Sequence, residues 1–296
     1  MNSKASVTAK KPKSSKKNLV IILSAVVTLM VCLAGVGYYF YASSHTSSDD
    51  AFIDGHAIAV SPKVSGHILK VYIDDNQAVK AGELLAEIDS RDYMTRCDMA
   101  QANLESAQAK AAQAGEDVVR YKKLTLNDEI SKQDMEHVIV KAHVANAEAL
   151  AAKAALEQAK LDLSYTKIYA PAKGRVTQKA LEEGAFVQIG QTILTVVTPE
   201  RWVIANLKET DLKNIAPGQP VTIAVDAYPG KIFKGHVDSV QRGTGSRFSL
   251  LPAENATGNY IKIVQRVPVK IVFDEEPDAG HPLALGMSVI PVIKTK

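Results

Sequence analysis

The sequence predicts an elongated α+β protein of several domains, and three observations carry this prediction. An uncharged run near the N-terminus is long enough to cross a lipid bilayer. Two similar β segments with glycine turns enclose a long alanine-rich stretch with heptad spacing. Several short strand patterns fill the C-terminal third. Together they indicate a transmembrane helix, a β domain split by an α-helical coiled-coil hairpin, and a C-terminal β-barrel.

The first segment, residues 1–17, is a basic tail that we expect to be cytoplasmic. It holds six lysines and no acidic residue, whereas the whole chain carries a net charge of only +3. The rest of the chain is therefore slightly acidic, which gives no support for nucleic-acid binding. Two cysteines among 296 residues exclude a disulfide framework.

Residues 18–41 are predicted to form one transmembrane helix. Leu19–Tyr41 carries no charge, and as a helix it would reach about 34 Å. Lysines precede this run, and Asp49 and Asp50 follow it. The positive-inside rule therefore places the tail in the cytoplasm and residues 42–296 on the far side. A cleaved signal peptide is the alternative, although its apolar region would be shorter.

Residues 91–164 are predicted to form an antiparallel coiled-coil hairpin. This stretch is rich in alanine and free of proline, as helices are. Its apolar positions follow three-four spacing, at Cys97, Ala100, Leu104, Ala107, Ala111, Ala114, Val118 and Tyr121, then at Met135, Val138, Ala142, Ala145, Ala149, Ala152, Leu156, Ala159 and Leu163. Leu126–Ile130 interrupts the pattern, and Ser131 begins a capping-box sequence. One continuous helix is the alternative, but the turn residues and the new cap argue against it.

The flanking segments, residues 58–90 and residues 165–198, repeat one another. At a constant offset of 108 residues Gly66 matches Gly174, and the apolar positions that follow match as well. Short strands with glycine turns, present twice, indicate two halves of one small β domain. If the halves meet in space, they hold the base of the inserted hairpin rigidly.

Residues 199–296 are predicted to form a β-barrel, because short strand patterns alternate with turn signals. The expected strands are Trp202–Leu207, Val221–Val225, Ile232–Val240, Ile261–Val264, Val267–Phe273 and Met287–Ile293. A short helix is expected over Glu209–Ile215. Residues 42–57 form a linker, in which Asp50–Ile53 contributes a strand to the barrel.

The sequence resembles a known family of transport proteins. The segments that carry the resemblance are DDAFIDGHAIAVSPKVSGHI (residues 49–68), the split repeat, GSRFSLLP (245–252), NATGN (255–259), VQRVPV (264–269) and GMSVIPVI (286–293). They resemble membrane fusion proteins of the HlyD family, the periplasmic adaptors, and more narrowly the EmrA-type multidrug efflux subunits. The resemblance covers about residues 18–296, and the hairpin is shorter than is typical of EmrA-type adaptors.

The resemblance implies a lipoyl-like β domain and a non-enzymatic role in a tripartite efflux system of a Gram-negative bacterium. The chain would be anchored in the inner membrane by a single pass, with its bulk in the periplasm. Its partners would be an inner-membrane transporter of the major-facilitator type, a TolC-like outer-membrane channel and further copies of itself, as a trimer or hexamer. The cargo would be drugs or toxic hydrophobic compounds.

The resemblance also implies a docking motif at the hairpin tip. In many such adaptors the tip carries Arg-x3-Leu-x6-Ser, which meets the outer-membrane channel. Arg120, Leu124 and Ser131 occupy these positions here. The structural alternative is a solvated charge, a tip-packing residue and a helix cap, and a cap is compatible with a contact.

The sequence gives little support for a metal site or for a covalently attached cofactor. His137 and His143 are six residues apart, which does not place them on one helix face, so no metal site is expected. Lipoyl and biotinyl carriers are modified on a lysine in the turn between the halves, and Glu87–Arg91 offers none. No cofactor is therefore expected. An adaptor for an ABC-type exporter of proteins or peptides stays open as the alternative function.

Overall fold

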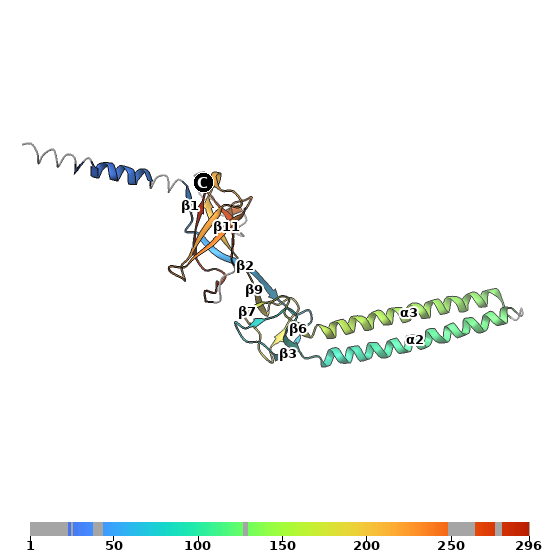
Figure 1. Ribbon diagram of the computed structural model, residues 1–296. Helices are drawn as coiled ribbons and strands as arrows, with labels where there is room; N and C mark the ends of the chain where they lie inside the picture. Colours follow the sequence, from blue (N-terminus) through green and yellow to red (C-terminus); the bar gives the residue numbers. More distant parts are fainter. Residues whose placement is uncertain are drawn as a thin grey trace, which may run out of the picture. The chain divides into compact units, whose positions relative to one another are not determined.

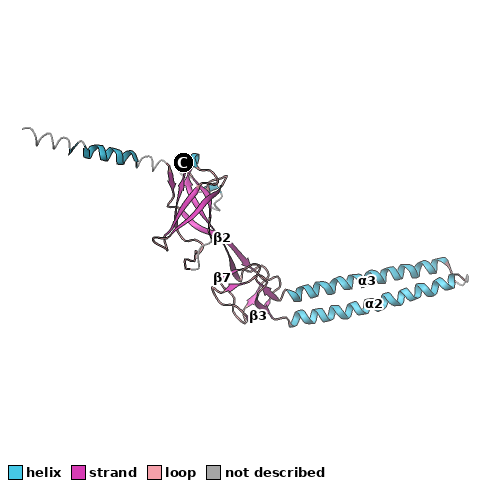
Figure 2. Ribbon diagram, in the orientation of Figure 1, coloured by secondary structure: helices cyan, strands magenta, loops and turns pink. Residues whose placement is uncertain are grey.

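The computed structural model describes residues 23–24, 26–37, 44–126, 130–247, 264–275 and 280–295 (Figure 1). The chain divides into two compact units, residues 55–200 and residues 1–54 with 201–296. Two strands run through the boundary, β2 (Ala51–Val60) and β9 (Leu194–Lys208). The first unit combines β-strands with a helical hairpin, and residues 201–296 of the second are mainly β-strands, so the predicted mixed α+β class is confirmed (Figure 2).

The predicted transmembrane helix, residues 18–41, lies partly outside the described residues, and so does the whole basic tail. Residues 26–37 are helical. Within the part of the chain that the structure describes, no helix combines the length and the hydropathy that a bilayer crossing requires.

The predicted hairpin is confirmed. Helices α2 (Arg91–Thr125) and α3 (Lys132–Ser164) lie side by side (Figure 1). All the predicted seam residues of both helices are buried or half-buried. Near the middle of the hairpin the contact is made by alanines, with Ala114 packed against Ala142 and Ala145. Small side chains at these positions let the two backbones approach closely, and the single-helix alternative is excluded.

The two repeats form one small β domain at the base of the hairpin. Its strands are β3 (Gly66–Val71), β4 (Ala78–Val79), β5 (Leu84–Ile88), β6 (Lys167–Tyr169), β7 (Gly174–Thr177) and β8 (Phe186–Val187). One sheet has the order β6-β5-β3-β8, and β4 pairs with β7, which pairs with β9. A single apolar core takes residues from both repeats, among them Ile68 and Leu85 from the first and Val176 and Ile193 from the second.

The pairing between the two repeats is reciprocal. Strand β3 of the first repeat pairs with β8 of the second, with Gly66 opposite Val187. Strand β4 of the first pairs with β7 of the second, with Val79 opposite Gly174. Because Gly66 and Gly174, like Val79 and Val187, are matched at the offset of 108 residues, these two pairings are equivalent. Each repeat therefore completes the other, as the sequence predicts.

The backbone hydrogen bonds obey the same symmetry. The Asn76 N–H donates to Val176 O at 3.1 Å, and the matched Gly184 N–H donates to Ile68 O at 2.8 Å. Asn76 and Gly184 both have positive φ, 61° and 84°. Asparagine is one of the few non-glycine residues that adopts this conformation readily, which is why it can stand where the second repeat has glycine.

Glycine is also required where the strands cross closely. A Cβ atom on Gly66 would lie 2.6 Å from the Ile88 side chain, and a Cβ atom on Gly174 would lie 2.8 Å from the Val196 side chain. Ile88 and Val196 are again matched at the offset of 108. The conspicuous glycines of the repeat thus mark the two places where any side chain would separate the strands.

The C-terminal β-barrel is confirmed. Its strands are β1 (His45–Ser47), β10 (Pro220–Val225), β11 (Ile232–Val240), β12 (Arg266–Phe273) and β13 (Val289–Lys294), together with β9, and they pair antiparallel in the order β1-β13-β10-β11-β12-β9. Strand β2 pairs with β9 and, through Ile53, exchanges hydrogen bonds of 2.9 and 2.8 Å with Met287 and Gly286. The predicted strand from Asp50–Ile53 is therefore present and joins the two ends of the sheet.

The predicted helix over Glu209–Ile215 is wrong, since only one 3-10 turn forms, η1 (Leu212–Asn214). Ile215 is already extended, and Pro217 disfavours helix at the residue before it. Of the predicted strand Ile261–Val264, residues 261–263 lie outside the described residues and Val264 belongs to no strand. The motif residues 248–252 and 255–259 also lie outside the described residues.

Candidate functional site

The residues of the predicted docking motif lie at the end of the hairpin where α2 stops and α3 starts. Arg120 and Leu124 lie in the last turns of α2, and Ser131 directly precedes α3. Residues 127–129 of the connecting turn lie outside the described residues. The structure therefore brings all three motif positions to one end of the hairpin.

Ser131 is the N-cap of α3. Its backbone is extended, with φ −76° and ψ 153°, and its hydroxyl accepts a hydrogen bond from the Asp134 N–H at 3.1 Å. The same hydroxyl donates to the Asp134 carboxylate at 2.6 Å. The serine satisfies one of the free N–H groups at the start of the helix, and the aspartate lies favourably near the positive end of the helix dipole.

Arg120 makes only a loose local contact. Its guanidinium lies 3.5 Å from the Asp117 carboxylate one turn earlier, and its side chain is 67% exposed. Exposed pairs of this kind contribute at most about 1 kcal/mol, so little is lost when the guanidinium turns toward another acceptor. The arginine is thus accessible to a partner.

The tip also exposes an apolar side chain that the sequence reasoning missed. Leu126 is 81% exposed, the highest fraction among the large apolar side chains of the described residues. Leu124 and Ile130 beside it are half-buried. In the sequence, Leu126 is part of the predicted turn. A leucine that lies off the heptad seam, among charged and polar residues, could have indicated an exposed apolar side chain. The tip therefore presents an exposed apolar side chain and, from the last turns of α2, a largely exposed guanidinium.

The opposite end of the hairpin is held by buried hydrogen bonds. Tyr93 in the first turn of α2 is buried and donates its hydroxyl proton to Ser65 O at 2.7 Å. Thr166, which is also buried, donates from its hydroxyl to Leu163 O at 2.8 Å, and its backbone carbonyl accepts from the Ile88 N–H at 2.8 Å. Both helices are thereby fixed to the β domain.

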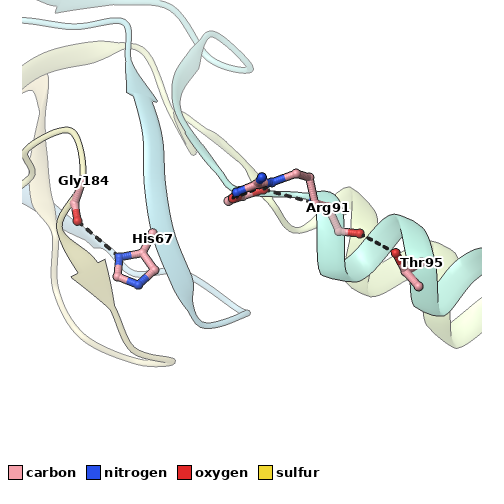
Figure 3. A network of polar contacts seen from close by, with 5 residues as sticks. His67, Arg91, Thr95 and Gly184 are labelled. Carbon is pink, nitrogen blue, oxygen red and sulfur yellow. Dashed lines mark hydrogen bonds and ion pairs between the residues drawn. The ribbon is translucent and has the colours of Figure 1, made fainter.

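An ionic contact between the half-buried Asp89 and the exposed Arg91 marks the start of α2. The Asp89 carboxylate accepts from the Arg91 backbone N–H at 3.1 Å and from its guanidinium at 2.6 to 3.0 Å. These hydrogen bonds lower the pKa of Asp89 to about 2. His67 approaches Gly184 O to 3.2 Å from the neighbouring strand, and the Thr95 hydroxyl donates to Arg91 O at 3.0 Å (Figure 3).

Over the described residues, no group of three or more His, Cys, Asp or Glu side chains is placed to hold a metal ion. Cys32 and Cys97 are free thiols, and Cys97 lies half-buried on the hairpin seam.

Two family models match the chain. Residues 56–199 match the barrel-sandwich hybrid domain of RND membrane fusion proteins, and residues 201–294 match the AAEA-like β-barrel domain. The multidrug export protein EmrA of Haemophilus influenzae is 31% identical, over 94% of this chain and 84% of that protein. The probable multidrug resistance protein EmrK of Escherichia coli is 32% identical, over 98% of this chain and 87% of that protein.

Among solved structures, a MacA-MexA chimera that contains the α-hairpin of Pseudomonas aeruginosa MexA has a TM-score of 0.59 and 30% identity. The match covers 86% of this chain and 82% of the chimera. The alignment with the Haemophilus protein spans 327 positions, which is more than the 296 residues of this chain. The Haemophilus protein therefore has inserted residues within the matched region.

Proposed function

Because this chain belongs to the membrane fusion proteins, the periplasmic adaptors that include EmrA, we propose that it is the adaptor of a tripartite efflux system. It couples an inner-membrane drug pump of the major-facilitator type to a TolC-like outer-membrane channel, and it performs no catalysis itself. The observation that carries this proposal is the hairpin, which is fixed at its base by buried hydrogen bonds and exposes Leu126 and Arg120 at its tip.

The chain is held in the inner membrane by residues 18–41, with the basic tail in the cytoplasm and the remainder in the periplasm. The helical residues 26–37 support this proposal, since Leu29, Val31 and Leu33 are 60 to 66% exposed. Burying such side chains in lipid is favourable by about 25 cal/mol per Å². The lysines before the run give the topology its direction.

The tip is the channel-docking site. Leu126 and Leu124 supply the apolar contact, Arg120 supplies a directional donor, and Ser131 keeps the first turn of α3 formed. Arg120→Asp is expected to lower export without lowering the amount of protein. Normal export by this variant would remove Arg120 from the docking site. Several copies, as a trimer or hexamer, surround the pump.

The test is affinity purification of the full-length chain from solubilised membranes after mild crosslinking, with partners identified by mass spectrometry. A major-facilitator transporter together with a TolC-like channel is the expected result, and drugs are then the cargo to test. Recovery of an ABC transporter instead would move the chain to the export of proteins or peptides, and the proposed drug cargo would be wrong.

A further inference from the structure

A large groove lies where the base of the hairpin meets the β domain, within the unit of residues 55–200. Its volume is about 1040 Å³. The lining combines apolar with polar and charged side chains. Its apolar members include the exposed Leu69 and Met94, the half-buried Leu163, and the buried Val60, Ile88 and Ile168. We call this feature the basal groove. Its size leaves room for a small molecule, and its exposed apolar side chains could contact an apolar body.

The charged side chains of the basal groove are mostly cationic. Lys63, Lys160 and Lys167 line it, and Glu87 is its one acidic lining residue. The Glu87 carboxylate is already engaged, since it accepts from the Tyr72 hydroxyl at 2.9 Å and lies 3.9 Å from the Lys167 ammonium. An added cation would therefore find no free carboxylate there, whereas an added anion would find lysines.

Two of these lysines are held only by exchangeable contacts. The Lys63 ammonium lies 4.5 Å from the centre of the Tyr165 ring, which keeps it at the groove in a cation–π contact. The Lys160 ammonium pairs at 3.1 Å with Glu157, which is 61% exposed and is not a lining residue. Exposed pairs of this kind are weak, so Lys160 can exchange Glu157 for an acidic ligand group.

We propose that the basal groove binds an amphiphilic anion, a molecule with one acidic head group and an apolar body. The apolar lining buries the body, and Lys63 and Lys160 bind the head group through charge-assisted hydrogen bonds. This inference rests on the proposed export role, because the ligand class that it names would be a class of exported cargo. Binding itself requires no partner and can be measured separately.

The experiment uses the full-length chain in nanodiscs of zwitterionic lipid and a dodecanoate probe with a photoactivatable diazirine at the chain end. Crosslinked peptides are mapped by mass spectrometry, which separates groove labelling from partition into lipid. We expect labelling on residues 60–63 and 163–169, about tenfold above that of a trimethylammonium probe with the same chain. Each lysine reversal should lower the yield about fivefold.

The double variant Lys63→Glu with Lys160→Glu tests the cationic side chains. Its matched control is Lys153→Glu with Lys173→Glu, which changes one exposed lysine of α3 and one exposed loop lysine of the β domain outside the groove. Circular dichroism checks that both variants stay folded. Equal labelling by both probes, labelling elsewhere, or unchanged labelling in the groove variant would each overturn the proposal. If the unsubstituted chain captures transporter and channel but shows no groove labelling, the groove proposal alone is overturned. If it shows groove labelling but captures neither partner, the adaptor role alone is overturned.

Discussion

The base and the tip of the hairpin differ in how completely their side chains are engaged. At the base, Tyr93 and Thr166 are buried with their hydroxyls hydrogen-bonded. In the β domain beneath, the two repeats pair through two equivalent contacts, β3 with β8 and β4 with β7. At the tip, Leu126 is 81% exposed and Arg120 has one loose partner. One end is therefore held rigidly, and the other leaves side chains available for contact with a partner. This difference also predicts that substitutions at the two ends fail in different ways.

The largest effect is expected from Leu85→Ala in the β domain. Leu85 is completely buried, and loss of a buried leucine costs about 2 to 5 kcal/mol through lost burial and a residual cavity. Hydrogen exchange of the β3, β5 and β7 amides should accelerate accordingly. Leu126→Ala at the tip is the control, since truncating an exposed side chain changes stability by about 0.5 kcal/mol or less. Similar exchange rates in the two variants would contradict the distinction between base and tip.

Leu126→Asp is expected to weaken channel binding without lowering stability, whereas Leu85→Ala lowers stability. Burial of a leucine in an interface contributes about 1.5 to 3 kcal/mol, so affinity for the outer-membrane channel should fall about tenfold to a hundredfold. The thermal unfolding temperature should stay unchanged. Leu150→Asp, at a position 68% exposed in the middle of α3, is the matched control and should leave channel binding unaffected. Equal losses from both variants would remove the tip from the docking site.

The base could be predicted from the sequence more fully than the tip. The offset of 108 residues and the heptad seam are periodic signals, and periodicity reports directly on which residues are buried. The role of Tyr93 could not be predicted, because it depends on one hydrogen bond to Ser65, 28 residues earlier, and sequence periodicity does not report such a contact. The basal groove could not be predicted for the same reason, because only the folded chain brings Lys63 and Lys160 to one groove.

At the tip, the sequence predicts the cap but not the contact. Ser131 and Asp134 form the capping pair that their spacing predicts, because capping is a local interaction. The predicted docking role of Arg120, Leu124 and Ser131 depends on another protein and stays a prediction. The predicted helix over Glu209–Ile215 failed because a composition compatible with helix was overruled by Pro217 and the extended Ile215.

A smaller effect is expected from Ser131→Ala, which separates the two roles of this residue. Loss of the N-cap should cost about 1 kcal/mol locally and speed hydrogen exchange in the first turn of α3. Ser131→Asp keeps an acceptor for the helix N–H groups and should restore the exchange rate. If channel binding recovers in Ser131→Asp as well, the serine acts only as a cap. If protection recovers without binding, the hydroxyl itself contacts the channel.

The smallest effect concerns the ionic contact at the start of α2. The folded pKa of Asp89 is lowered to about 2, below the ordinary value of 3.8, so the ionised form is favoured in the folded state. Its contribution to stability is therefore present above about pH 4 and is lost as the pH falls toward 2. Asp89 is partly exposed and Arg91 is exposed, so salt should weaken the contribution. Hydrogen exchange of the first turn of α2, measured from pH 5 to pH 2 at low salt, should show this loss in the native chain but not in Asp89→Asn. An identical pH dependence in both would mean that the base is held by its buried hydrogen bonds alone, and the contrast with the tip would then rest on Tyr93 and Thr166.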